Sequence, residues 1–143
     1  MWDSSVLCVI SVMLLLSAAQ RPPPPSGKYV KVVHEPTDCV RVDFLPGEAA
    51  EVELFIDCHR SEKTSDDLSV VEIRPFYYQV AANSTHAYED FRLDVESGCP
   101  YNVTDGDLET FDYDYKANTV TVKFEKNPLT LSPGVCPLPL RLG

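Results

Sequence analysis

Hydrophobic and polar residues alternate along most of the chain from Lys28 onward. In residues 39–58, every second position is hydrophobic on both sides of Pro46 and Gly47, a pair that is typical of turns. Because successive side chains of a strand point to opposite faces, this segment predicts a β-hairpin with one buried face. The residues expected on the buried face are Val40, Val42, Phe44, Val52, Leu54 and Ile56.

A second alternating segment begins at LETFDYDYK, residues 108–116, where aromatic and acidic residues alternate. Hydrophobic residues alternate again after the short connection KAN, so this segment also predicts a hairpin. Its aromatic side chains are expected on one face and its acids on the other. The aromatic and hydrophobic residues are Phe111, Tyr113, Tyr115, Val120, Val122 and Phe124, and the acids between the rings are Asp112 and Asp114.

Residues 68–81 are rich in β-branched and aromatic residues, and Pro75 interrupts them, which predicts two strands or one bent edge strand. Short strands at intervals of about 8 to 12 residues, separated by turn residues, indicate an all-β domain. We therefore predict a single antiparallel β-sandwich of the Greek-key or immunoglobulin-like type, or a related barrel, over residues 29–143. The Pro-rich segment from Pro128 onward is expected to pack as an irregular or edge segment.

Residues 87–96 fit two structures. Their hydrophobic residues alternate, so we predict a strand. The alternative is a short helix that opens at Ser84 and Thr85. The alternating residues are Phe91, Leu93 and Val95.

The N-terminus predicts a secretory signal peptide over residues 1–19. An apolar run over residues 6–16 precedes the small residues Ser17, Ala18 and Ala19, and the run is too short to span a membrane. Four consecutive prolines follow, so residues 20–28 are expected to form a stiff polyproline II spacer.

Cleavage after Ala19 removes Cys8 and leaves four cysteines, an even number that predicts two disulfides in a secreted chain. In the first hairpin Cys39 falls on the outward face and Cys58 on the inward face, so a regular ladder disfavours a bond between them. We favour Cys58 with Cys99, and Cys39 with Cys136. The sequons at Asn83 and Asn102 predict N-glycosylation at the surface.

The chain has a net charge of −10, which disfavours binding to nucleic acid or to anionic lipid and favours a basic extracellular protein as partner. We predict that the acidic tyrosine segment contacts this partner. If its tyrosines were exposed, sulfation could add further charge there; inward-facing rings are the alternative. The candidate residues are Asp107, Glu109, Asp112, Tyr113, Asp114 and Tyr115. Further acids expected at the surface are Glu89, Asp90 and Asp105, and further aromatic anchors are Tyr77 and Tyr101.

The sequence contains no EF-hand loop, no paired histidine motif, no nucleophile elbow and no phosphate-binding loop. We therefore expect no enzymatic activity, cofactor or metal. One alternative function is a carrier of a lipid or small apolar ligand, with a lining formed by Phe76, Tyr78, Phe91, Phe111, Tyr113 and Phe124. Another is a structural or coat component. In overall character the chain resembles the small, acidic, disulfide-bonded decoys that viruses and blood-feeding parasites secrete against host cytokines and chemokines.

Overall fold

The computed structural model describes residues 21–34, 36–59 and 61–138, so the predicted signal peptide lies outside the described residues. Strands dominate this part of the chain, together with one α-helix and one short 3-10 helix. The elements are β1 (Gly27–His34), β2 (Asp38–Phe44), β3 (Glu51–Cys58), β4 (Ser61–Thr64), β5 (Leu68–Arg74), β6 (Tyr77–Val80), η1 (Ala82–Ser84), α2 (Thr85–Gly98), β7 (Thr110–Asp114), β8 (Thr119–Phe124) and β9 (Asn127–Pro133).

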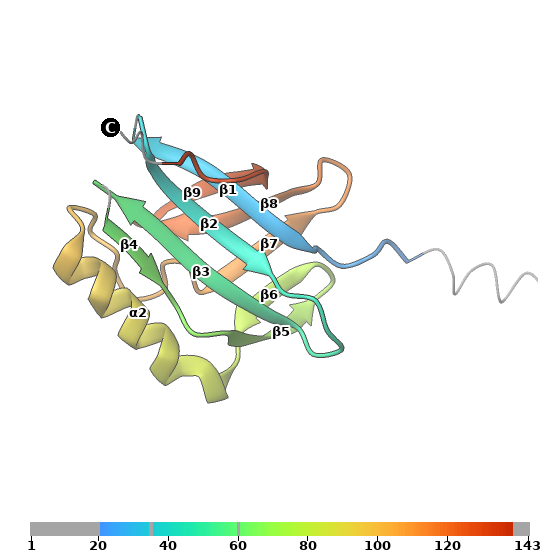
Figure 1. Cartoon of the computed structure of the whole chain (residues 1–143). Helices are drawn as coiled ribbons and strands as arrows, with labels where there is room; N and C mark the ends of the chain where they lie inside the picture. The colour runs from blue at the N-terminus through green and yellow to red at the C-terminus, as the bar shows by residue number, and fades with distance from the viewer. Residues whose placement is uncertain (1–20, 35, 60, 139–143) are drawn as a thin grey trace, which may run out of the picture.

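All the strands except β4 form a closed antiparallel barrel of eight strands. Apart from β4, each strand pairs with the strands before and after it in the chain (Figure 1). The barrel closes where β1 pairs with β9, with Tyr29 opposite Pro133. The expectation of an irregular or edge segment from Pro128 onward is therefore wrong for β9, which pairs with β8 on its other side. The short strand β4 shares one edge of β3 with β5. The expected sandwich with Greek-key connections is therefore corrected to the barrel alternative. Period-two alternation is the same in both architectures, and only the pairing of the first strand with the last decides between them.

The two predicted hairpins are confirmed. In the first, Val40 lies opposite Ile56 and Val42 opposite Leu54, and all four side chains are fully buried. In the second, Tyr113 lies opposite Val120. Residues 68–81 form two strands, which confirms the first of the two alternatives at Pro75.

The prediction of a strand over residues 87–96 is wrong, because this segment belongs to helix α2. Tyr88, Phe91 and Val95 are buried at helical spacing, whereas Leu93 is 52% exposed. The alternation is only apparent, because Leu93 lies between the buried residues Phe91 and Val95 in the sequence but does not pack in the core. Helix α2 lies along β3 and β4 on one side of the barrel (Figure 1).

Aromatic rings fill much of the barrel interior. Phe44 makes edge-to-face contacts with Tyr29, Tyr78 and Phe111 at centroid distances of 5.8, 6.1 and 6.0 Å. Ring pairs in this geometry contribute roughly 0.5–1.5 kcal/mol each beyond the burial of their area. The interior is therefore a packed aromatic core around Phe44.

Both favoured disulfides are present, joining Cys39 to Cys136 and Cys58 to Cys99. The first holds the segment after β9 against the outside of β2. The second fastens the end of β3 to the residue that follows α2. No helix within the described ranges has the length and apolar character needed to cross a membrane.

Candidate protein-binding face

The six residues predicted to contact a partner separate into three places. Asp107 and Tyr113 lie in the interior, with exposed fractions of 0% and 9%, so the expectation that they face a partner is corrected. Glu109 is half-buried ahead of β7. The remaining three lie together at the surface, at the end of β7 and in the turn after it: Asp112, Asp114 and Tyr115.

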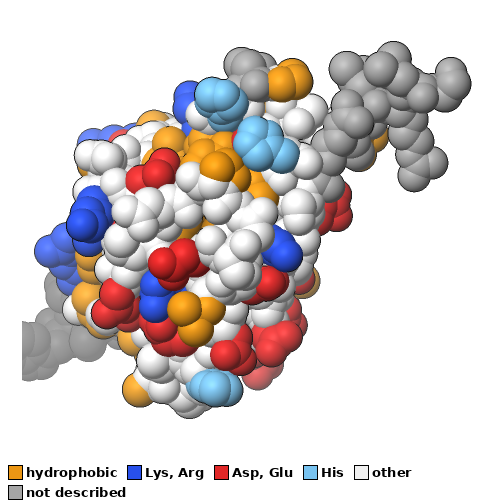
Figure 2. All heavy atoms as spheres, turned by 90° about the vertical axis from the view of Figure 1, so that its left-hand side faces the viewer, with side chains coloured by type: hydrophobic (Ala, Val, Ile, Leu, Met, Phe, Trp, Pro, Cys, Tyr) orange, Lys and Arg blue, Asp and Glu red, His pale blue; other side chains and the backbone are white. Residues whose placement is uncertain are grey.

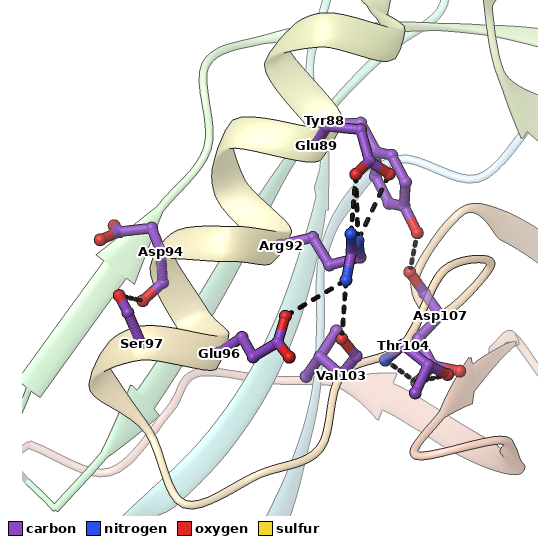
Figure 3. A network of polar contacts seen from close by, with 9 residues as sticks. All are labelled: Tyr88, Glu89, Arg92, Asp94, Glu96, Ser97, Val103, Thr104 and Asp107. Carbon is purple, nitrogen blue, oxygen red and sulfur yellow. Dashed lines mark hydrogen bonds and ion pairs between the residues drawn. The ribbon is translucent and has the colours of Figure 1, made fainter.

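Asp107 is buried because it organises the loop between α2 and β7. Its carboxylate accepts hydrogen bonds from the backbone N–H of Thr104 at 2.9 Å and of Lys126 at 3.1 Å. Its carbonyl oxygen accepts one from the Tyr88 hydroxyl at 2.6 Å (Figure 3). The alternation of hydrophobic and polar positions could not predict the burial of Asp107, because this residue precedes the strand to which the alternation applies.

The exposed residues line a groove of about 720 Å³ on the outside of β7, β8 and β9. We call it the acidic–aromatic groove. Its lining includes acids and a pair of rings, Phe76 and Tyr115, whose centroids are 5.1 Å apart. The residues that line it are Pro75, Phe76, Asp112, Tyr113, Asp114, Tyr115, Lys116, Thr119, Thr121 and Thr130.

Phe76 reaches the groove because of the tight turn between β5 and β6. Pro75 precedes it, and Phe76 itself has a φ of +62°, which is unusual for a residue other than glycine. Its carbonyl oxygen accepts a hydrogen bond from the backbone N–H of Tyr113 at 2.8 Å. Its own N–H donates to the Glu72 carboxylate at 3.3 Å. A strained backbone that neighbouring groups hold in place is frequent at binding sites.

The two acids of the groove differ in their partners. One carboxylate oxygen of Asp114 accepts hydrogen bonds from the backbone N–H of Lys116 at 3.0 Å and of Ala117 at 3.2 Å, so this residue shapes the turn. Asp112 is exposed on the strand, and its carboxylate has no hydrogen bond or ion pair to any residue that the structure describes. Asp112 is therefore available to a cationic group from outside.

Acidic side chains also gather away from the groove. Figure 2 shows them at several places on the face to the left in Figure 1, with basic side chains among them. Burial raises the pKa of Glu109, and the negative charges of Asp105 and Glu89 raise it further. Acids are therefore not confined to the groove, and the groove is distinguished by a pair of rings beside its acids.

A second polar cluster lies at the opposite end of the barrel. Although burial alone would raise the pKa of Asp38, hydrogen bonds from the Tyr101 hydroxyl and the His59 backbone N–H lower it. The Tyr101 ring also packs on Phe124. No catalytic nucleophile is among these groups, and the cluster ties the loop after α2 to β2.

Both predicted glycosylation residues are exposed. Asn83 lies in η1 ahead of α2, and Asn102 lies in the loop that follows it. The turn between β7 and β8 lies on another side of the barrel in Figure 1. Glycans at these two positions would leave the acidic–aromatic groove uncovered.

The sequence analysis missed Arg21 and Glu72, which lie beside Phe76. The guanidinium of Arg21 forms an ion pair with Glu72 at 2.5 Å and lies over the Phe76 ring at 5.9 Å. The hydrogen bond from Arg21 lowers the pKa of Glu72. These residues are 51 positions apart, and no local pattern connects them.

Comparisons of the chain with protein-family models, curated proteins and solved structures found no match.

Proposed function

We propose that the protein is a secreted, acidic glycoprotein that binds a basic extracellular protein, of the cytokine or chemokine kind, through the acidic–aromatic groove. The observation that carries the proposal is the ring pair of the exposed Tyr115 and the half-buried Phe76, beside the unpartnered carboxylate of Asp112. The two disulfides fit the oxidising conditions of an extracellular compartment.

Binding would proceed in two steps. The negative surface attracts a cationic partner over a distance of about 10 Å, and salt screens this attraction. Lys or Arg side chains of the partner then reach Asp112 and Asp114, and apolar or cationic groups cover the Phe76 and Tyr115 rings. Exposed aromatic residues often supply a large share of the binding energy, and rings also attract cations.

Affinity capture tests this proposal. The secreted protein serves as bait in extracellular fluid, and bound proteins are compared with those captured by a variant that carries Asp112→Asn, Asp114→Asn and Tyr115→Ala. We expect basic proteins that the wild type retains and the variant loses. A matched control, Glu62→Gln with Asp66→Asn and Leu93→Ala, changes the same kinds of residue at exposed positions elsewhere and should retain them. Equal loss from both variants would contradict the proposal.

The carrier alternative has less support. Of the six aromatic residues expected to line an apolar cavity, five belong to the core cluster, and Phe76 is half-buried and packs against it. A structural or coat role would be supported by homotypic assembly in sedimentation. Neither alternative accounts for rings placed beside acids on the outside of the barrel.

A further inference from the structure

Residues 21–26 lie across one end of the barrel, and we call them the strap. Pro25 is buried and Pro22 is half-buried, although both precede the first strand. At the junction Gly27 has a φ of +79°, a conformation that suits glycine and turns the chain from β1 into the strap. The strap therefore contacts the barrel mainly through Pro22 and Pro25, while its other residues are exposed.

The surface under the strap is aromatic. Pro24 and Pro25 line a hollow of about 220 Å³ together with Phe44 and Tyr78. Further along, Pro22 and Pro23 line a second hollow with Phe76 and Tyr78. Proline rings packed against aromatic side chains are the usual basis for recognising polyproline II segments.

A charge anchors the other end of the strap. Arg21 pairs with Glu72 and lies over Phe76, so its guanidinium sits between a carboxylate and a ring. Phe76 borders both the strap and the acidic–aromatic groove. The surface under the strap and the acidic–aromatic groove are therefore continuous. The strap places an arginine on the first surface, and we propose that the groove binds cationic groups of the same kind.

We propose that Glu72, Phe76 and Tyr78 form a binding site for basic polyproline II peptides, which the strap of the same chain occupies. The ligand would be an extended, proline-rich segment of a partner with an arginine at its N-terminal end. The strap would compete with it and lower its apparent affinity. This inference rests on the proposed function for the identity of the partner, but the binding site itself is tested independently.

The test uses the full secreted chain and a synthetic peptide, Arg-Pro-Pro-Pro-Pro-Ser, with blocked ends. In an open-strap variant, Arg21→Glu removes the anchoring charge, and Pro24→Gly with Pro25→Gly removes the stiff, buried prolines. Isothermal titration then compares the wild type with this variant. If the strap is closed nine-tenths of the time, the variant binds the peptide about tenfold more tightly than the wild type.

Two further variants check the chemistry. Adding Glu72→Gln to the open-strap variant should weaken binding of the peptide, whereas adding Glu62→Gln, a matched change on β4, should not. A peptide with glutamate in place of arginine should bind more weakly than the original. These measurements need no natural partner, so they do not depend on Asp112, Asp114 or capture from extracellular fluid.

Each other result would overturn the inference. No binding to the open-strap variant would show that these residues form no peptide site. Equal binding to wild type and variant would show that the strap does not occupy it. Unchanged binding after Glu72→Gln would show that the arginine is not recognised there. The groove could still bind a basic protein in all three cases, and a failure of the groove would leave the peptide result standing.

Discussion

The two ends of the barrel are held together in different ways. At the end near α2, a disulfide, the buried Asp107 and the Tyr88 hydroxyl fasten the helix and its loop to the strands. At the other end, the strap is held by packed prolines and one exposed ion pair. The first end is built from buried, mutually satisfied groups, and the second keeps rings and carboxylates within reach of solvent. Stability is thus expected to reside mainly at the first end and binding at the second.

Among the changes that distinguish the two ends of the barrel, the largest effect is expected from removing the disulfide beside α2. Cys58→Ala with Cys99→Ala should lower the free energy of unfolding by about 4 kcal/mol in the chain-entropy model, since the bond closes a long loop. Chemical denaturation measures this change. The contrast between the two ends would fail if opening the strap, by Pro24→Gly with Pro25→Gly, destabilised the protein as much.

The next prediction compares Asp107 with Asp112, two acids that the sequence analysis both placed at the surface. Asp107→Ala removes a fully buried carboxylate and leaves the partly buried N–H groups of Thr104 and Lys126 without this acceptor, and should cost about 3 kcal/mol. Asp112→Ala, at an exposed site, should change stability by less than about 0.5 kcal/mol. Urea denaturation of both variants tests the pair, and similar losses would refute the assignment of one to the interior and the other to the surface.

Alkaline pH should weaken the fold through its buried tyrosines. Burial, with a smaller contribution from Glu109, raises the pKa of Tyr88, and burial with Glu72 raises the pKa of Tyr78 to about 12. In the unfolded chain these phenols lose their protons near pH 10, so unfolding releases protons above that value. Stability is therefore fully present below pH 10 and falls as the pH rises, by up to about 1.4 kcal/mol per pH unit for each such tyrosine.

Denaturation at several alkaline pH values measures this slope. Tyr88→Phe and Tyr78→Phe should each make it shallower. A slope that neither substitution changes would contradict the burial assigned to these two tyrosines.

The smallest effect on stability is expected in the groove. Tyr115→Ala removes an exposed ring in a turn, so the midpoint of thermal unfolding should stay within the error of the measurement. Capture of the basic partner should nevertheless fall. A large loss of stability would indicate that the Tyr115 ring stabilises the fold, which would contradict its assignment to a binding surface.

Much of the fold follows from the sequence because its signals are local. The alternation at Val40, Val42 and Leu54 predicts the buried face of the first hairpin, and the opposite parity of Cys39 and Cys58 disfavours a bond between them. Barrel closure does not follow, because it depends on contacts between the two ends of the chain.

The helix and the site show where local patterns fail. An exposed leucine, Leu93, imitates strand alternation within α2, and Asp107 belongs to a loop although acids near it face outward. The alternation correctly separates Asp112 from Tyr113. It carries no information on Arg21 or Glu72, which meet only in the folded chain.

The central claim, that the acidic–aromatic groove captures a basic protein, is tested most directly by association kinetics. A panel of basic cytokines and chemokines is measured against the wild type, Asp112→Asn with Asp114→Asn, and the charge-matched control Glu62→Gln with Asp66→Asn, at low and at high salt. We predict that at least one member binds, that salt slows its association, and that the groove variant slows it more than the control. No binding by any member, or equal slowing by the two variants, would contradict the claim.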